Sequence, residues 1–141
     1  MVLYDATTSN KLDSAVIKTG IPEKLLMMRA ASSVWNIVEK LAKVSRVFSI
    51  AGPGNNGGDA YGVAIFSAIA GYNTSIYSTK EPSGTSKKIA EFCHALGADK
   101  LGFLPDPNEI SCDDVIIDGL LGSGLNRPPA DHYLDVIEWI N

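Results

Sequence analysis

Hydrophobic residues near the start of the chain recur three or four positions apart, which is the spacing of one face of an α-helix. The first such pattern, Leu12–Ile17, predicts a short helix that ends at Gly20, where Gly-Ile-Pro breaks the repeat. The second pattern, approximately Glu23–Lys43, predicts a longer helix with one side in the core. Because Met27 and Met28 lie in that apolar stripe, we expect them to fill space in the core rather than to contact a ligand.

Further along the chain, short runs of β-branched and aromatic residues alternate with helical patterns. The predicted strands are Arg46–Ala51, Asn73–Thr79, a short segment Lys100–Leu104 and Val115–Asp118. One predicted helix begins near Gly57–Asp59, and two more span about Ser86–Leu96 and Asp131–Ile140. Strands that alternate with helices imply right-handed crossovers and a mainly parallel sheet covered on both faces. The pattern therefore predicts an α/β, Rossmann-like three-layer domain with two additional N-terminal helices.

One domain of this kind accounts for the whole chain. Its 141 residues and 45% hydrophobic content suffice for one sizeable core, so we expect a single domain over residues 1–141. The last predicted helix, Asp131–Ile140, is typical of a crossover, but no strand follows it. We therefore expect the domain to be incomplete at its C-terminus.

The composition of the chain argues against nucleic-acid binding, a zinc site and a membrane span. Twelve Lys and Arg against 16 Asp and Glu give a net charge of −4, which is the wrong sign for binding nucleic-acid backbones. Neither the two cysteines, Cys93 and Cys112, nor the two histidines, His94 and His132, have the spacing of a zinc site, and we expect reduced thiols. We expect Cys93 to be buried and His94 to lie at the surface of their helix. The chain has no signal-peptide pattern and no apolar run of the roughly 18 residues needed to cross a bilayer, so the sequence predicts a cytoplasmic location and no membrane partner.

A glycine-rich loop, Gly52–Asp59, follows the first predicted strand and precedes a helix. Gly52, Gly54 and Gly57 satisfy GxGxxG in the context that dinucleotide-binding folds require. The acidic ribose partner expected about 20 residues further on is missing, because the second strand ends in Ser-Thr-Lys. A redox enzyme that uses NAD is therefore disfavoured.

A second glycine-rich loop, Asp118–Pro129, follows the last predicted strand. In a doubly wound sheet the first strand and the strand beyond the point of reversal are neighbours, so both loops should open onto one crevice at the carboxyl ends of the strands. Main-chain N–H groups of the glycines and the helix beginning near Gly57 favour an anionic pyrophosphate there, and Arg127 could add positive charge.

Four oxygen-bearing side chains in these loops, Asn55, Asn56, Asp59 and Asp118, indicate more than a phosphate cradle. They are candidates for acid/base groups or for ligands of a hard cation, and the residue types leave Mg²⁺, Ca²⁺ and a monovalent ion open. In a purely structural alternative, the first loop is a strand-to-helix turn in which Asp59 supports the helix N-terminus, and Asp118 caps the segment that follows it.

The two loops resemble those of the NAD(P)H-hydrate epimerase family, also called the YjeF N-terminal domain. That family combines a GxGNNGGDG-type loop with a later DxLxGxG-type loop ending in Arg-Pro, and this chain has NNGGD and DGLLGSGLNRP in the same order. A G-[IL]-P…LM segment also matches, at Gly20–Pro22 and Leu26-Met27. Ala60, where the family usually has glycine, and the Met28-Arg29 pair depart from the family pattern.

The resemblance implies that two loop segments bind the hydrated nicotinamide dinucleotide and that two side chains ligate K⁺. Asn56 and Asp118 are the implied potassium ligands. Asp59 is the candidate catalytic residue, a general acid/base for the hydroxyl that leaves the ring carbon. The implied substrate-binding residues are Asn55, Asn56, Gly57, Gly58, Asp59, Gly122, Ser123, Gly124, Leu125, Asn126, Arg127 and Pro128.

The activity implied by the resemblance is an isomerase reaction of nicotinamide-nucleotide repair. It interconverts the R and S hydrates of NADH and NADPH, and a dehydratase domain or protein acts on the same small-molecule substrate. Family members continue into a D-x-P-S-G motif whose Asp meets the substrate and whose Ser completes the potassium site, and this sequence ends at Asn141 before such a motif. The alternative function is a non-catalytic Rossmann-like scaffold or dimerisation module, which would form a homodimer. The intact NNGGD and GSG loops favour the enzyme.

Overall fold

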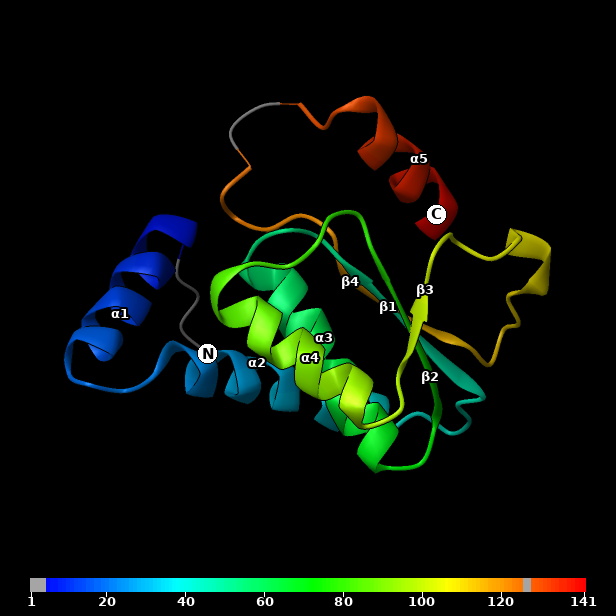
Figure 1. Cartoon of the computed structure of the whole chain (residues 1–141), viewed down its shortest axis with the longest axis horizontal. Coiled ribbons are helices and arrows are strands. Elements are labelled where there is room, and N and C mark those ends of the chain that lie inside the picture. Colours follow the sequence, from blue (N-terminus) through cyan, green and yellow to red (C-terminus); the bar gives the residue numbers. More distant parts are fainter. Residues whose placement is uncertain (1–4, 126–127) are drawn as a thin grey trace.

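The computed structural model describes residues 5–125 and 128–141. Along the chain the elements are α1 (Ala6–Lys18), α2 (Glu23–Val38), β1 (Arg46–Ala51), α3 (Asn55–Ile69), β2 (Asn73–Ser78), α4 (Gly84–Ala95), β3 (Asp99–Leu101), a 3-10 turn (Pro107–Glu109), β4 (Val115–Gly119) and α5 (Asp131–Ile140). Figure 1 shows two helices, α1 and α2, that precede the first strand. The predicted alternation of strands and helices after an N-terminal pair of helices is therefore confirmed.

The four strands form one parallel sheet in the order β3-β2-β1-β4. At the carboxyl end of β1, Ala51 pairs with Ser78 of β2 on one side and with Gly119 of β4 on the other. β2 and β3, which follow β1 in the sequence, lie on one side of it, and β4 pairs with β1 on the other side. The strand order therefore reverses at β1, as in a doubly wound sheet.

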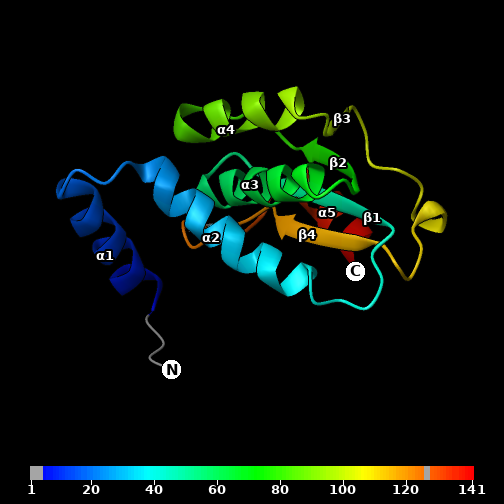
Figure 2. The same cartoon turned by 90° about the horizontal axis from the view of Figure 1, so that it is seen from below.

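Helices cover both faces of this sheet (Figure 2). Successive residues of a strand point to opposite faces, and the core follows that rule. Val47 and Ala51 of β1 are buried among residues of α2, α3 and α4. Ile50 faces the other way and packs with Leu120 and with Val136 of α5. This arrangement confirms the predicted three layers.

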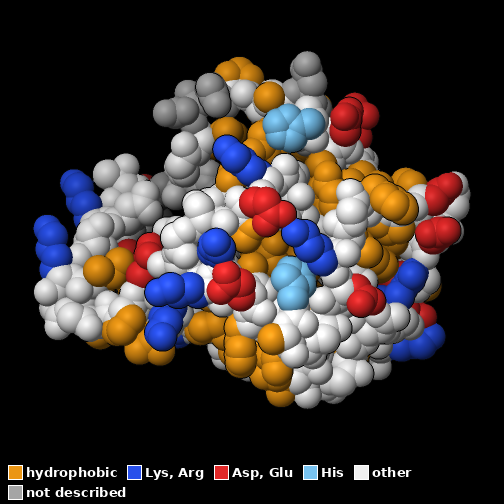
Figure 3. All heavy atoms as spheres, viewed as in Figure 1, with side chains coloured by type: hydrophobic (Ala, Val, Ile, Leu, Met, Phe, Trp, Pro, Cys, Tyr) orange, Lys and Arg blue, Asp and Glu red, His pale blue; other side chains and the backbone are white. Residues whose placement is uncertain are grey.

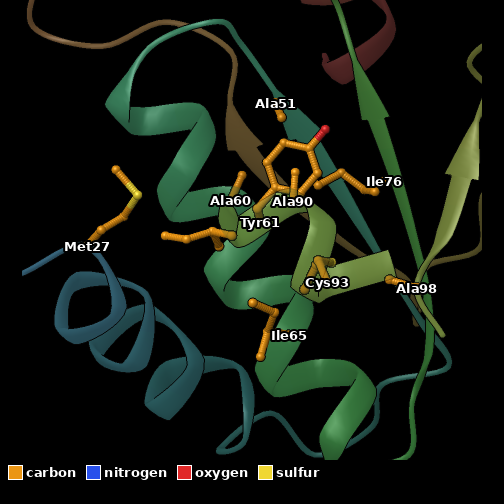
Figure 4. Packing of buried hydrophobic residues seen from close by; sticks show 11 residues of the cluster. Met27, Ala51, Ala60, Tyr61, Ile65, Ile76, Ala90, Cys93 and Ala98 are labelled. Carbon is orange, nitrogen blue, oxygen red and sulfur yellow. The ribbon is translucent and has the colours of Figure 1, made fainter. Parts of the chain in front are cut away.

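The core between the sheet and helices α2, α3 and α4 consists of interdigitated apolar side chains (Figure 4). Met27 is buried in it and Met28 packs against it, as predicted. Cys93 is also buried there, and burial raises the pKa of its thiol to about 12, so this cysteine is a packing residue. The neighbouring His94 is half-buried rather than at the open surface, because its ring packs edge-on against Tyr61 and its Nδ1 lies 3.1 Å from the Ala98 carbonyl oxygen.

Several helix boundaries differ from the prediction. α1 begins at Ala6, ahead of the predicted apolar stretch, and α4 spans Gly84–Ala95 rather than about 86–96. α2 ends at Val38 rather than near Lys43, since the N–H groups of Lys40 and Leu41 donate to carbonyls three residues back, at 3.1 and 3.0 Å, in a tight turn. Leu41 continues the apolar pattern but remains 47% exposed, so its hydrophobicity does not mark a helical core position. α3 begins at Asn55, two residues before the predicted start, and the Asn-Asn pair therefore belongs to its first turn.

The described surface shows charges of both signs. On the face shown in Figure 3, Lys and Arg side chains are interspersed with Asp and Glu. Surfaces that bind nucleic-acid backbones instead gather positive charge. Among the helices of residues 5–125 and 128–141, none combines the length and the apolar character needed to span a membrane.

Candidate functional site

The two glycine-rich loops meet at the carboxyl ends of β1 and β4. Ala51 and Gly119 are register partners at these strand ends, and the next residue, Gly52, donates its N–H to the Gly119 carbonyl at 3.0 Å. This is the point at which the strand order reverses, where open α/β sheets bind their ligands. The predicted juxtaposition of the two loops is therefore confirmed.

Glycine is required where these loops touch. A Cβ on Gly52 would lie 1.9 Å from the Leu120 carbonyl oxygen, and a Cβ on Gly57 would lie 2.0 Å from the Gly52 carbonyl oxygen. A Cβ on Gly119 would lie 2.7 Å from the Asn56 carbonyl oxygen. Real side chains do not fit at such distances, so the glycines allow the backbones of both loops and the start of α3 to pack directly together.

A cavity of about 710 Å³ opens between the loops, α1 and the start of α5. Its volume lies in the range of small-molecule and cofactor sites, roughly 300–1,000 Å³. Polar side chains and glycines from the loops form much of its lining. The lining residues are Ser9, Asn10, Asp13, Pro53, Gly54, Asn55, Asn56, Gly57, Asp59, Leu120, Leu121, Gly122, Ser123, Gly124, Leu125, Pro128, Pro129, Ala130 and Tyr133.

Most of the residues predicted to bind substrate line this cavity. They come from the first turns of α3 and from the loop after β4, which are far apart in the sequence. Asn126 and Arg127 lie outside the described residues. The predicted residues that line the cavity are Asn55, Asn56, Gly57, Asp59, Gly122, Ser123, Gly124, Leu125 and Pro128.

Gly58 and Asp118 are predicted site residues that do not line the cavity. Gly58 is buried on the opposite side of α3, where a Cβ would lie 2.3 Å from Met27 Sδ and 2.6 Å from Ser86 Oγ. It therefore allows α3 to pack closely against α2 and α4. Asp118 is exposed at the end of β4, and its Oδ1 accepts a hydrogen bond from the Leu120 N–H at 2.9 Å, which is the capping geometry of the structural alternative.

Asn56 joins the two loops through its side chain. Its Nδ2 donates to the Leu121 carbonyl oxygen at 2.8 Å, and the side chain is half-buried. This contact uses the amide nitrogen and leaves the amide oxygen available to a ligand. The helix to which Asn56 belongs has Gly54 at its N-cap and no side-chain capping hydrogen bond, so the amide groups of its first turn are open to an anion.

Asp59 is the half-buried carboxyl of the cavity wall. Burial, followed by the negative charge of Asp13, raises the pKa of Asp59 to about 6. A carboxyl with that pKa retains a population of its acid form close to neutral pH, which suits a general acid.

A smaller cavity of about 160 Å³ adjoins the other side of Asp59. Asp13, Asn55 and Asp59 line both cavities. Glu23, at the start of α2, also lines the smaller one and connects three helices. Its carboxylate accepts hydrogen bonds from Thr85 Oγ1 at 2.5 Å and from Asn55 Nδ2 at 3.4 Å.

Two walls of the larger cavity were not predicted from the sequence. Ser9, Asn10 and Asp13 of α1 form one of them, and Tyr133 of α5 belongs to the other. The polar side of α1, with Asp13 one turn after Ser9 and Asn10, is visible as a helical pattern and could have marked that wall. No local pattern distinguishes Tyr133 as a cavity residue.

Comparison with protein families assigns most of the chain to a known group. The family model for the YjeF-related protein N-terminus matches residues 23–141. This chain therefore belongs to that family.

Curated relatives cover nearly the whole chain. The NAD(P)H-hydrate epimerase of Levilactobacillus brevis is 30% identical over 98% of this chain and 61% of its own length. The NAD(P)H-hydrate epimerase of Lentilactobacillus buchneri is 34% identical over 94% of this chain and 63% of its own length. The bifunctional NAD(P)H-hydrate repair enzyme Nnr of Coxiella burnetii is 29% identical over 96% of this chain and 29% of its own length. The chain thus spans about three fifths of the length of the first two relatives.

A solved structure shows the same fold. The crystal structure of yeast ynu0 superimposes with a TM-score of 0.82 and covers 99% of this chain and 65% of the yeast chain, at 23% sequence identity. The parallel sheet with its helices is therefore the fold of that protein as well.

Proposed function

We propose that this chain carries the epimerase site for hydrated NADH and NADPH, and that it interconverts their R and S forms. The observation that carries the proposal is a half-buried carboxyl, Asp59, in the wall of a cavity between two glycine-rich loops at the reversal point of a parallel sheet. The names of the curated relatives support the same reaction. A redox role is disfavoured because the second strand lacks the acidic ribose ligand.

The cavity suits a nucleotide with a pyrophosphate. The uncapped first turn of α3 offers main-chain N–H groups and the positive end of the helix dipole to the phosphate oxygens. Gly122, Ser123 and Gly124 approach the same space from the loop after β4. The hydrated nicotinamide ring would then lie toward Asp59, the carboxyl on this wall.

Epimerisation requires that the C–O bond at the hydroxyl-bearing ring carbon breaks and forms again. Protonated Asp59 gives its proton to the departing hydroxyl, and the lone pair of the ring nitrogen supports the cation that remains. Water then adds to the other face of the carbon, and the proton that it releases restores the protonated form of Asp59. General acid/base catalysis of this kind contributes roughly 10²–10⁴-fold to a rate.

Asn56 and Asp118 are the residues that would hold K⁺. Both supply oxygen donors, and they lie close together because the Asn56 carbonyl packs against Gly119, the residue after Asp118. The Asn56 amide oxygen and the second carboxylate oxygen of Asp118 remain available beside their hydrogen bonds to the loop. The donor set therefore fits a hard monovalent cation, which would order the two loops and offset carboxylate charge.

The proposed reaction calls for a dehydratase, as a domain or a separate protein, that recovers the cofactor from one hydrate form. The bifunctional repair enzymes among the relatives support this class of partner. The rival proposal is a scaffold whose function is to dimerise.

Isothermal titration of NADP⁺ into the chain tests the proposal, once with potassium and once with tetramethylammonium in its place. We expect binding with potassium and weaker binding without it. A sizing column and an epimerisation assay, with Asp59→Asn as the variant, complete the test. A stable dimer with neither nucleotide binding nor epimerisation would favour the scaffold, and full activity of the variant would remove Asp59 from the acid role.

A further inference from the structure

Helix α1 borders the cavity but contributes little to the core. Figures 1 and 2 show it apart from the sheet, at one end of the molecule and connected through a loop to α2. Its apolar side chains remain open to solvent, with Leu12 46% and Ile17 38% exposed. A surface helix is normally retained by burial of its apolar face. The polar residues that α1 presents to the cavity therefore suggest a role other than packing.

Asp13 is the charged residue on the cavity side of α1. It follows Ser9 by four positions and Asn10 by three, so all three share one face of the helix and line the larger cavity. Asp13 also lines the smaller cavity together with Asp59. α1 thus brings a second carboxyl to both spaces that adjoin Asp59.

The groups around Asp59 are acidic or neutral. Asp13 faces it from α1, Glu23 from α2 across the smaller cavity, and Tyr133 from α5 across the larger one. Over residues 5–125 and 128–141, no Lys or Arg lines either cavity. The burial of Asp59 and, after it, the negative charge of Asp13 favour the protonated form of Asp59. A carboxylate beside a carboxylic acid supplies a base and an acid at one site.

We propose, on the basis of the epimerase function proposed above, that Asp13 is a second catalytic carboxyl, the base that works with Asp59 as the acid. It lies outside residues 23–141, the range that the family model matches. Helix α1 is then a part of the catalytic site.

The reaction balances with these two carboxyls and water. Protonated Asp59 donates its proton to the ring hydroxyl while the C–O bond breaks, and water leaves. A water molecule adds to the opposite face of the same carbon, and ionised Asp13 accepts the proton released as the new C–O bond forms. The proton then returns from Asp13 to Asp59, which restores both groups and leaves the hydrate with inverted configuration.

The test compares Asp13→Asn with Asp59→Asn and with a control on the same helix. Asp5→Asn removes one negative charge from α1 but lines neither cavity, and asparagine replaces aspartate well as the N-cap of that helix. Two readouts are needed, the NMR titration of the Asp59 carboxyl carbon and the rate of epimerisation as a function of pH.

In the Asp13→Asn variant we expect Asp59 to titrate at a lower pH, the rate to fall about 100-fold, and the basic limb of the pH profile to move to lower pH. Asp5→Asn should match the unsubstituted chain in both readouts. An active chain whose Asp13→Asn variant behaves like the control would overturn the role of Asp13 alone. An unsubstituted chain that does not epimerise would overturn the proposed function and, with it, the catalytic role of Asp13.

Discussion

Two walls of the same cavity are built in opposite ways. α3 carries Asp59 and is buried along most of its length, whereas α1 carries Asp13 and is exposed along nearly all of its described side chains. Packing holds the α3 wall in one arrangement, and the α1 wall lacks that support. Burial therefore identifies the α3 wall of the cavity but not the α1 wall, because a lightly packed helix supplies the latter.

The largest expected effect comes from a change in the packed wall. Gly57→Ala would place a Cβ 2.0 Å from the Gly52 carbonyl oxygen, and backbone must move to accommodate it. We expect a loss of about 3 kcal/mol or more in the free energy of unfolding, measured by urea denaturation. Gly54→Ala is the matched control in the same loop, because its Cβ meets nothing within 4 Å. The control should lose no more than about 1 kcal/mol. Equal losses in the two variants would contradict the close approach of the loops.

A matched pair of isoleucines, one in each helix, measures how much the packing of α3 and of α1 contributes to the free energy of unfolding. Ile65 of α3 is 2% exposed, and Ile17 of α1 is 38% exposed. Ile65→Ala should cost about 2–4 kcal/mol, because it leaves a cavity in the core. Ile17→Ala should cost less than about 1 kcal/mol. Thermal and urea unfolding give both values, and similar costs would mean that α1 is held as firmly as α3.

The smallest expected effect is the pH dependence that Asp59 adds to stability. Burial and Asp13 raise the pKa of Asp59 from its ordinary value of 3.8 to about 6, so the folded chain holds a proton that the unfolded chain loses in that interval. The stabilisation is complete below the unfolded pKa and is lost as the pH rises through the folded pKa. Relative to the unsubstituted chain, Asp59→Asn should therefore gain about 1 kcal/mol between about pH 4 and pH 7, a value reduced for partial solvent screening.

Asp5 supplies a control of opposite sign for this titration. Hydrogen bonds from Thr8 lower the pKa of its carboxyl, so its contribution is present at neutral pH and lost in acid. Stability curves of Asp59→Asn and Asp5→Asn, recorded by urea denaturation over the same pH range, should therefore slope in opposite directions relative to the unsubstituted chain. Parallel slopes would contradict the raised pKa of Asp59.

Local patterns predicted most of the elements and much of the cavity. The bounds of β1 and α5 agree with the structure residue for residue, because β-branched runs and helical periodicity register local backbone preference. The predicted end of α2 was wrong, because exposed apolar residues such as Leu41 continue the hydrophobic pattern beyond the last residue of the helix. Gly58 belongs to the same motif as its neighbours, but it faces α2 and α4 rather than the cavity.

Residue type and spacing along the chain were enough to predict the α/β class and the two glycine-rich loops, because each depends on one element or loop. The tertiary structure decided that Asp13 stands beside Asp59, that Tyr133 closes the opposite wall, and that Gly58 packs between helices. These relations depend on how separate elements meet. Contacts between elements far apart in the chain arise from packing of whole faces, for which no single segment carries a local signal.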